Sequence, residues 1–424
     1  MKYLIIGNGI AGVSAAEAIR EIDSAGEIIM VSDEVDLPYS RPMITSLLEG
    51  SCTEQQLPIR SSDFYSRLNI TPILGHRVNR LDVVKQTVEL ASGRSLNYNR
   101  LLIASGADPR RVKAEGAELK NIFYMRTIDH VREQLAAFAD VRRAVVLGGG
   151  LVGFKSACAL HKQGVKVTLI ITSAYPLSMQ VDEVAGRMLL GEMLSYGFEI
   201  RVGASVEAFE SDICEKDKDS PEKNNKHERV SAVLLNTGER LACELVIAGK
   251  GVIPAHSFVP RDLVAVDLGI IVNSRMETTT PNIYAAGDVA ECIDISRQSP
   301  WINAIWPEAA IQGRIAGQNM AGRKVHHKGS LSRNVMRVFG LDVMTIGLAN
   351  AGEESDLKFF RTPDTTKGYY RSLVFKGDIM VGAVLVNNIE QGGVLRALIE
   401  NRTPVRVSPE TLLSTRFNFA KLLP

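Results

Sequence analysis

The sequence contains one glycine-rich pattern twice, each time between a short apolar segment and a run of small and apolar residues. The first copy is residues 7–12 (Gly-Asn-Gly-Ile-Ala-Gly) and the second is residues 148–153 (Gly-Gly-Gly-Leu-Val-Gly). In a G-x-G-x-x-G turn the first glycine permits the tight turn, the second lets the backbone approach a pyrophosphate, and the third allows close packing of helix on strand. The helix N-terminus then presents free amides to the phosphates. One such motif is weak evidence, but two strand-flanked copies predict two dinucleotide-binding units.

The rest of the chain is organised around these two units. A chain of 424 residues, 45% of them hydrophobic and 23% charged, has a globular composition and is too long for one hydrophobic core. We therefore predict an α/β fold with two Rossmann-like domains and a smaller α+β domain at the C-terminus. Alternating segments at 370–375 and 379–386, with a helix at 392–399, indicate an antiparallel sheet in that third domain. The charged stretch 212–229 is predicted to be a solvated hairpin loop.

Charge and cysteine usage exclude several classes of partner and site. Lys and Arg number 49 against 48 Asp and Glu, so no net positive field draws the chain to nucleic acid or to a membrane surface. Five scattered cysteines without a C-x-x-C pair argue against a zinc site, a cluster-binding loop and a local disulfide, so no metal is expected. Reduced thiols indicate the cytoplasm. No apolar run reaches the roughly 18 residues of a membrane span, and the apolar N-terminal segment holds a glycine motif, which argues against a secretory signal.

Further motifs stand in a fixed order with the two glycine turns. They are Ala-Ser-Gly at 104–106, Ala-x-x-Gly-x-x-Pro at 248–254 and Tyr-Ala-Ala-Gly-Asp at 284–288. This set, which covers essentially the whole chain, resembles the FAD-dependent pyridine nucleotide-disulfide oxidoreductase superfamily. Pro-Tyr-Ser-Arg-Pro at 38–42 and Trp-Pro-Glu at 306–308 are similar to the branch of rubredoxin reductases, ferredoxin reductases and the flavin portion of NAD(P)H nitrite reductases.

The resemblance implies a division of labour. The first glycine turn would hold the FAD pyrophosphate and the second NAD(P)H, with residues 1–110 and 256–325 forming the FAD domain, 111–255 the NAD(P) domain and 326–424 an interface domain. Asp288 would contact the FAD ribityl and phosphate region, although it could instead cap a helix after Val289. A helix starting at Trp306 would point its positive end at the flavin pyrimidine ring, and core packing is the competing role of Trp306.

Some cofactor contacts are less determined. Asp33 or Glu34 could bind the FAD ribose or belong to a solvated turn. Residues 170–173 carry neither the acid that favours NADH nor the Arg that favours NADPH, so the coenzyme stays open, with NADH slightly favoured. The residues expected to bind the cofactors are Gly7, Gly9, Ile10, Ala11, Gly12, Ser32, Asp33, Glu34, Arg41, Pro42, Val78, Ala104, Ser105, Gly106, Arg110, Gly148, Gly150, Leu151, Val152, Gly153, Gly251, Gly287, Asp288, Trp306, Pro307 and Glu308.

Departures from the family pattern decide the chemistry. Disulfide-reducing members need a reactive cysteine beside the flavin, whereas this chain has residues 38–42 there, and Cys52 ten residues beyond reads as an incidental loop thiol. Many relatives pair a Lys with a Glu beside flavin N5, but this chain has Ser46 and Lys155 at those places. Our hypothesis is that Lys155 supplies the cation as a catalytic residue. The alternative, given equal weight, is a solvent-facing helical Lys.

These features predict an FAD-dependent NAD(P)H oxidoreductase that passes electrons to an iron-sulfur acceptor without a redox disulfide. The acceptor would be a ferredoxin, a rubredoxin or an iron-sulfur enzyme such as CO dehydrogenase, and the chain could form a homodimer or a complex subunit. One alternative is an NADH oxidase, peroxidase or disulfide reductase that uses Cys52. Another is an FAD-binding scaffold subunit, which would not be reduced by NADH or NADPH.

Overall fold

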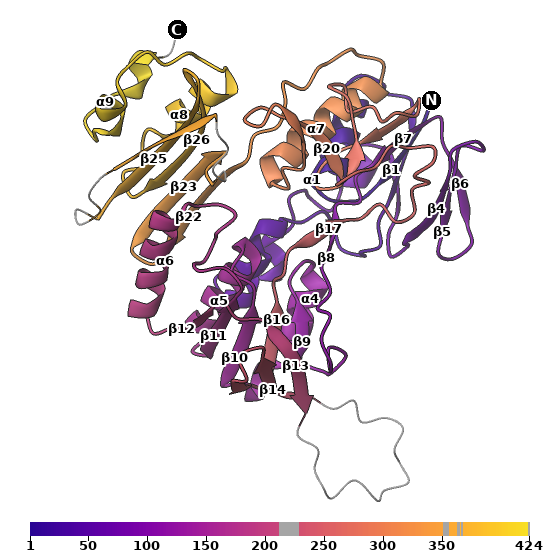
Figure 1. The fold of residues 1–424 in the computed structure, drawn as a ribbon. Coiled ribbons are helices and arrows are strands. Elements are labelled where there is room, and N and C mark those ends of the chain that lie inside the picture. Colours follow the sequence, from indigo (N-terminus) through magenta and orange to yellow (C-terminus); the bar gives the residue numbers. More distant parts are fainter. Residues whose placement is uncertain (212–228, 351–355, 363–364, 366–367, 423–424) are drawn as a thin grey trace, which may run out of the picture.

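The computed structural model describes residues 1–211, 229–350, 356–362, 365 and 368–422. Figure 1 shows three sheet-centred parts, the N-terminal one in indigo and orange, the central one in magenta and the C-terminal one in yellow. The predicted α/β fold with two Rossmann-like units and a smaller C-terminal sheet domain is confirmed. The stretch predicted to be a hairpin loop, 212–229, lies almost wholly outside the described residues; the strands on either side pair in antiparallel fashion.

The first sheet combines strands from the first 103 residues with one strand from residues 283–285. Its five parallel strands have the order β19-β7-β1-β2-β3. Helices α1 (Ile10–Arg20) and α7 (Trp306–Met320) pack so tightly that a Cβ on Gly313 or Gly317 would overlap the backbone of α1. The strands are β1 (Lys2–Ile6), β2 (Glu27–Val31), β3 (Ile70–Ile73), β7 (Arg100–Ile103) and β19 (Ile283–Ala285).

Smaller elements surround this sheet. One antiparallel sheet contains β4 (Val78–Asp82), β5 (Thr87–Leu90) and β6 (Ser95–Asn97). In a second small sheet, β20 (Ala290–Asp294) pairs in antiparallel fashion with β21 (Ser299–Trp301) and in parallel with β18 (Ile270–Ile271). The short helices are α2 (Ile44–Glu49) and α3 (Phe64–Arg67). Because β20 directly follows Val289, the alternative role of Asp288 as the cap of a helix at that point is wrong.

The second sheet repeats the parallel plan with the order β12-β11-β10-β16-β9. Its strands are β9 (Ile122–Tyr124), β10 (Arg143–Leu147), β11 (Lys166–Ile171), β12 (Glu199–Val202) and β16 (Leu245–Ala248). Its helices are α4 (Ile128–Ala136), α5 (Leu151–Lys162) and α6 (Glu183–Ser195), and an antiparallel sheet of β13 (Val206–Ser211), β14 (Val230–Leu235) and β15 (Arg240–Ala242) is attached. Buried apolar strands in both sheets fit the two-sided cover of a parallel sheet.

The chain passes between the first two parts through an antiparallel ribbon. Strand β8 (Ala107–Pro109) pairs with β17 (Val252–Pro254), with Ala107 opposite Pro254 and Pro109 opposite Val252. The outgoing and the returning crossings are therefore neighbours, and they lie beside the carboxyl ends of the first sheet's strands.

The C-terminal part is an antiparallel sheet with the order β22-β23-β26-β25-β24, and α8 packs on β23 and β26. The predicted strands and helix appear here as β25 (Tyr370–Lys376), β26 (Ile379–Val386) and α8 (Gly392–Glu400). The other elements are β22 (Arg333–Val338), β23 (Leu341–Gly347), β24 (Leu357–Arg361) and α9 (Pro409–Leu413).

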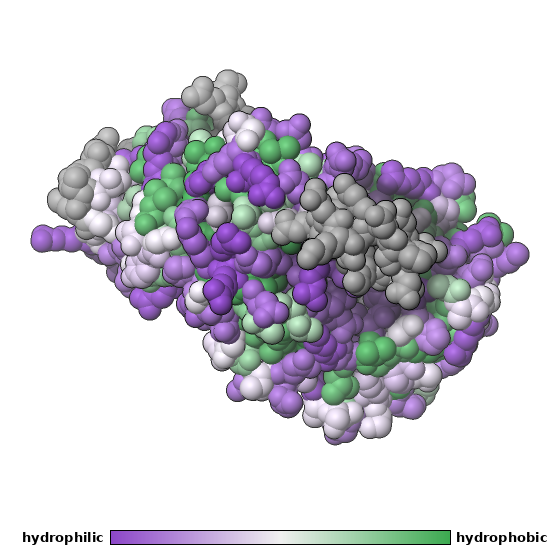
Figure 2. All heavy atoms as spheres, turned by 90° about the horizontal axis from the view of Figure 1, so that it is seen from below, coloured by the Kyte–Doolittle hydropathy of each residue, from purple (hydrophilic) through white to green (hydrophobic). Residues whose placement is uncertain are grey.

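Within the part of the chain that the structure describes, no helix combines the length and the apolarity needed to cross a bilayer. Figure 2 looks at the end of the molecule formed by the second sheet and shows hydrophobic residues as separate patches among hydrophilic ones.

Candidate cofactor site

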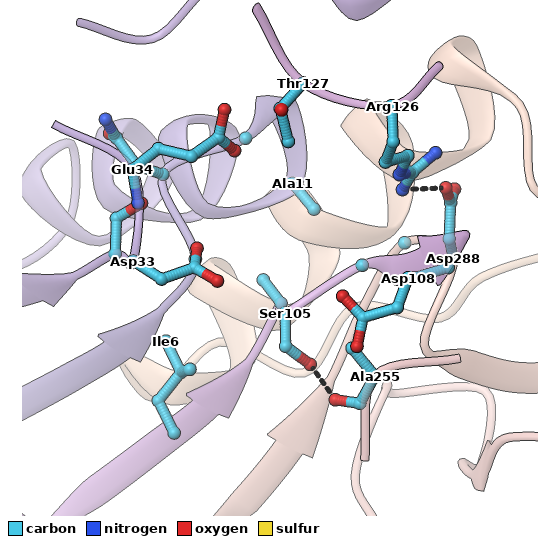
Figure 3. Close-up of a pocket in the computed structure, with 18 of the residues that line it drawn as sticks. Ile6, Ala11, Asp33, Glu34, Ser105, Asp108, Arg126, Thr127, Ala255 and Asp288 are labelled. Atoms are coloured by element: carbon cyan, nitrogen blue, oxygen red, sulfur yellow. Dashed lines mark hydrogen bonds and ion pairs between the residues drawn. The ribbon is translucent and has the colours of Figure 1, made fainter. Parts of the chain in front are cut away.

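A cavity of about 460 Å³ opens at the carboxyl ends of the first sheet's strands, where the first glycine turn lies. Ligand crevices of doubly wound sheets lie at this edge. Figure 3 shows that side chains from sequence-distant segments converge on it. Its lining consists of residues 6–11, 31–34, 41–42, 76–78, 104–109, 111, 126–127, 130, 255, 257–258, 286–288, 304, 306 and 309.

The first glycine turn has the geometry that an anionic diphosphate requires. Gly7 has a φ of +116°, and a Cβ there would overlap the Ala104 carbonyl oxygen, while a Cβ on Gly12 would overlap the carbonyl oxygen of Gly7. Gly9 has no protein atom within 4 Å of its Cβ position, so its backbone is open toward the cavity. Helix α1 has neither a side-chain cap nor an acid in its first turn. Its first amides are therefore free for a phosphate ligand.

The second glycine turn repeats this geometry. Gly148 has a φ of +108°, and a Cβ on Gly153 would overlap the Gly148 carbonyl oxygen. Gly150 again has no protein atom within 4 Å of its Cβ position, and α5 starts without a side-chain cap or a first-turn acid. Leu151 and Val152 begin that helix and pack against an apolar core to which the second sheet contributes. Gly251, with a φ of +84°, lies one residue before β17.

The acids after β2 have different partners. Glu34 accepts hydrogen bonds from the Tyr39 hydroxyl and from the Arg41 guanidinium, whereas Asp33 is exposed and points along the cavity in Figure 3. Burial, together with the Glu34 carboxylate, raises the pKa of Tyr39, so its hydroxyl keeps its proton and donates. Both acids line the cavity, but Glu34 is held by Tyr39 and Arg41 whereas Asp33 is exposed.

One side of the cavity is closed by residues at the start of α4, from the second part. Arg126 forms an ion pair of 2.8 Å with Asp288, and its backbone carbonyl accepts a bond of 2.9 Å from Arg41. Thr127 caps α4 by accepting from the His130 amide at 3.3 Å. Burial lowers the pKa of His130, so this ring is neutral near pH 7. These three residues were not expected at the site from the sequence: a Thr three residues before His130 is a helix-start signal, but nothing marked Arg126.

The structure brings most of the expected first-site residues to the cavity and leaves a few elsewhere. Pro42, Val78, Ala104, Gly106 and Gly287 are in the lining. The Ser105 hydroxyl, also in the lining, donates to the Ala255 carbonyl at 2.6 Å (Figure 3). Arg110 is exposed and lies outside the lining; its neighbour Arg111 takes that place, with its guanidinium 4.5 Å from the ring centre of Tyr124.

The predicted helix start at Trp306 is confirmed, with Pro307 in the first turn of α7. Trp306 is half-buried in the cavity wall, and Ala309 lies beside it. Glu308, expected at the cofactor, turns to the other side of α7, where it contacts His327 and Arg333. A helix presents successive residues to different faces, so only part of the Trp-Pro-Glu motif can face the cavity.

Lys155 and Cys52 lie outside the cavity lining. Lys155 is exposed on α5, and its catalytic role stays a prediction. Cys52 is partly buried with its Sγ 3.9 Å from the Met43 carbonyl, and burial together with Glu49 raises the pKa of its thiol. A protonated thiol is a poor nucleophile. The described cysteines, Cys52, Cys158, Cys243 and Cys292, are all free.

Comparison with known proteins places this fold and cavity in a family. Residues 1–313 match the pyridine nucleotide-disulphide oxidoreductase model, and residues 333–403 match the rubredoxin NAD+ reductase C-terminal domain. The chain belongs to the pyridine nucleotide-disulphide oxidoreductase family, in its rubredoxin reductase-like branch. It is an FAD-dependent NAD(P)H oxidoreductase.

Individual relatives match over nearly the whole chain. The NADH-dependent phenylglyoxylate dehydrogenase subunit epsilon of Aromatoleum evansii is 30% identical over 98% of this chain and 94% of its own length. The NADH-rubredoxin oxidoreductase of Clostridium acetobutylicum is 26% identical over 94% of each chain. The covalent putidaredoxin reductase-putidaredoxin complex contains a chain with a TM-score of 0.88 and 27% identity, covering 99% of this chain and 97% of that one. Two other curated relatives are longer, and this chain spans about half of them, 48% and 49%.

Proposed function

We propose that this protein takes electrons from a nicotinamide dinucleotide and delivers them through FAD to an iron-sulfur protein, without a redox disulfide. The observation that carries the proposal is the pair of like glycine turns, of which the first opens into a cavity whose described lining contains no cysteine. The relatives named for rubredoxin and putidaredoxin reduction support an iron-sulfur acceptor. The raised pKa of Cys52 and its place outside the cavity speak against the oxidase, peroxidase and disulfide reductase alternative.

The residues of the cavity fit FAD. The open backbone at Gly9 and the free amides of Ile10 and Ala11 would hold the pyrophosphate, and Arg126 would offset its charge. Asp33 would accept from the ribose hydroxyls, with Glu34 fixed beside it. Asp288 would accept from the ribityl chain.

The ring end of the cavity and the second site complete the assignment. Trp306 and Pro42 would border the ring system, where bound FAD supplies hydride acceptance and single-electron release. The residues that would bind NAD(P)H are Gly148, Gly150, Leu151, Val152, Gly153 and Gly251. We assign residues 1–110 and 256–325 to the FAD domain, 111–255 to the NAD(P) domain and 326–424 to the interface domain.

What the chain contributes to the reaction is positioning. The two parallel sheets and the β8–β17 ribbon between them hold the two glycine turns at fixed positions relative to each other. Hydride transfer between stacked rings needs such fixed positioning of the two dinucleotides. No residue has to act as a general base. NADH is the favoured coenzyme because relatives are named for it. Free thiols support a cytoplasmic location.

An anaerobic titration tests the proposal. Purified protein with bound FAD is expected to lose its visible flavin absorbance on addition of NADH or NADPH and then to reduce a rubredoxin or a ferredoxin. Cys52→Ser is expected to behave as the wild type. Protein that binds FAD but is not bleached by either coenzyme would support the scaffold alternative, and loss of turnover in Cys52→Ser would support the thiol alternative.

A further inference from the structure

Behind the first turn of α7, on the side away from the cavity, lies a buried cluster of charged side chains. Glu308 accepts a hydrogen bond of 2.6 Å from Arg333, and its other oxygen lies 3.4 Å from Nε2 of His327. The exposed fractions of these side chains are 4% for Glu308, 5% for His327 and 11% for Arg333. They come from α7, from the segment before β22 and from β22 itself, so the cluster joins the first part of the molecule to the C-terminal part.

The cluster is connected to the cavity wall in two ways. Trp306 and Ala309, on either side of Glu308 in the helix, both line the cavity. One turn further along α7, Gln312 accepts from the Gly287 amide at 2.8 Å and donates to Cys292 Sγ at 3.5 Å. Cys292 in turn lies near His327, where it raises the pKa of that ring. Two hydrogen bonds therefore link Gly287, in the cavity wall, through Gln312 to Cys292 beside the charged cluster.

The charge of the cluster depends on His327, because Glu308 and Arg333 carry opposite charges. Burial alone would raise the pKa of Glu308, but the His327 contact and the hydrogen bond from Arg333 lower it, so the carboxyl is ionised. Burial likewise opposes protonation of His327, yet Cys292 and Glu308 raise its pKa to about 9. With His327 protonated, the two cations Arg333 and His327 face the Glu308 carboxylate. A fourth charge, Glu400 on α8, lies 4.0 Å from Arg333 and is 31% exposed, so solvent weakens its effect.

We propose that His327 and Arg333, with Glu308 between them, are positioning residues that act through α7 to favour reduction of the cofactor in the cavity. Reduction adds negative charge to a group bordered by Trp306 and Ala309. A net positive cluster directly behind that turn, in a poorly screened interior, stabilises the added charge. Removing the positive charge disfavours reduction. This inference rests on the proposed function only in requiring FAD in this cavity.

The test is the midpoint potential of the bound flavin at pH 7, measured by spectroelectrochemistry. His327→Gln and Arg333→Gln each remove one positive charge and are expected to make reduction about tenfold less favourable, about 30 mV for a two-electron couple. Glu308→Gln removes the negative charge and is expected to leave the potential equal or higher, even if His327 then loses its proton. Lys328→Gln, which removes the exposed cation next to His327, is the matched control and is expected to change nothing.

The signs of these shifts separate an electrostatic role from a structural one. A packing defect would move the potential in the same direction in all three cluster variants, and that result would overturn the inference. Equal potentials in wild type and His327→Gln would do so too. If His327→Gln does not fold, the wild type is tested alone: its potential must fall more steeply with pH near 9, where His327 titrates, and an unchanged slope there overturns the proposal.

A measurement without cofactor completes the design. The imidazole signal of His327 in the apoprotein, followed by NMR from pH 6 to 10, is expected to titrate near 9. Titration below 7 would contradict the assigned charge and with it the inference. Failure of the proposed function looks different, because the wild-type protein would then not bind FAD or would not be bleached by either coenzyme.

Discussion

The two glycine turns have the same backbone geometry but lie in different surroundings. In each, the first and third glycines are in contact with neighbouring backbone and the second is open. Around the first turn, the residue that follows the second strand, Ser32, is buried, and Arg126 reaches across from the second part to Asp288. Around the second turn, the corresponding residue, Thr172, is exposed. Under the proposed function, each turn would determine where a diphosphate lies. The more enclosed surroundings of the first turn would suit a resident cofactor, and the open surroundings of the second would suit an exchanging coenzyme.

The largest effect on stability is expected at the third glycine of each turn, which packs against the carbonyl oxygen of the first. Gly12→Ala places a Cβ against the Gly7 carbonyl oxygen, where backbone cannot move away, so the free energy of unfolding should fall by about 3 kcal/mol or more. Gly153→Ala should be comparably damaging. Urea unfolding followed by tryptophan fluorescence measures both. The control is Gly191→Ala in α6, where the added methyl meets no atom within 4 Å; a Gly12→Ala protein as stable as this control would show that the close approach is not needed.

The open glycines are expected to separate the two sites. Gly9→Ala and Gly150→Ala should both fold, because no protein atom lies within 4 Å of either added methyl. Gly9→Ala should weaken FAD binding about a hundredfold, or about 3 kcal/mol, because the methyl enters the space of the pyrophosphate. Gly150→Ala should keep its flavin and bind NAD(P)H more weakly. Flavin content after gel filtration and coenzyme titration give the two readouts; loss of flavin in both variants would contradict the assignment.

The closing residue of the first site gives a smaller effect. Arg126→Ala removes the partner of Asp288 and a cation beside the diphosphate, so FAD affinity should fall about 10- to 100-fold, the loss of one charged hydrogen bond. Coenzyme affinity should not change. Fluorescence recovery of released flavin measures the dissociation. Arg187→Ala, which removes an exposed helical ion pair with Glu183, is the control, and an equal effect in both variants would assign the change to general destabilisation.

The smallest effect is expected at the end of β11. Thr172→Arg adds a cation where a 2′-phosphate would lie and should shift the preference toward NADPH about tenfold. Thr172→Gln adds length without charge and should not. The ratio of kcat/KM for the two coenzymes is the measurement. An unchanged ratio in Thr172→Arg would mean that the adenosine ribose lies elsewhere than the second turn implies.

The sequence was sufficient for the parts of the molecule that local patterns encode. Glycine spacing located both parallel units, alternation located the strands 370–375 and 379–386 of the C-terminal sheet, and the proline at 307 located the start of α7. Residues of the first turn were expected at the cavity because glycines in this spacing have a local steric reason to be there.

What the sequence did not reveal depends on contacts between distant segments. Arg126 reaches Asp288 only because the β8–β17 ribbon and α4 bring the second part over the first. Arg111 rather than Arg110 lines the cavity, and both residues lie beyond the end of β8, where no regular pattern predicts the direction of a side chain. Glu308 turns away because it contacts His327 and Arg333, which lie 19 and 25 residues downstream. No local sequence pattern encodes these contacts.

The chain leaves the N-terminal part at β8 and returns to it at β17, and these two strands are paired. The central part is therefore inserted at one position of the N-terminal part. Since Pro109 lies opposite Val252, a two-residue turn could join these strands and excise everything between them. The product would be a miniature flavin carrier lacking both its coenzyme module and the Arg126 closure. Conversely, the same junction is a natural point at which another module could be grafted to feed the flavin from a different electron donor.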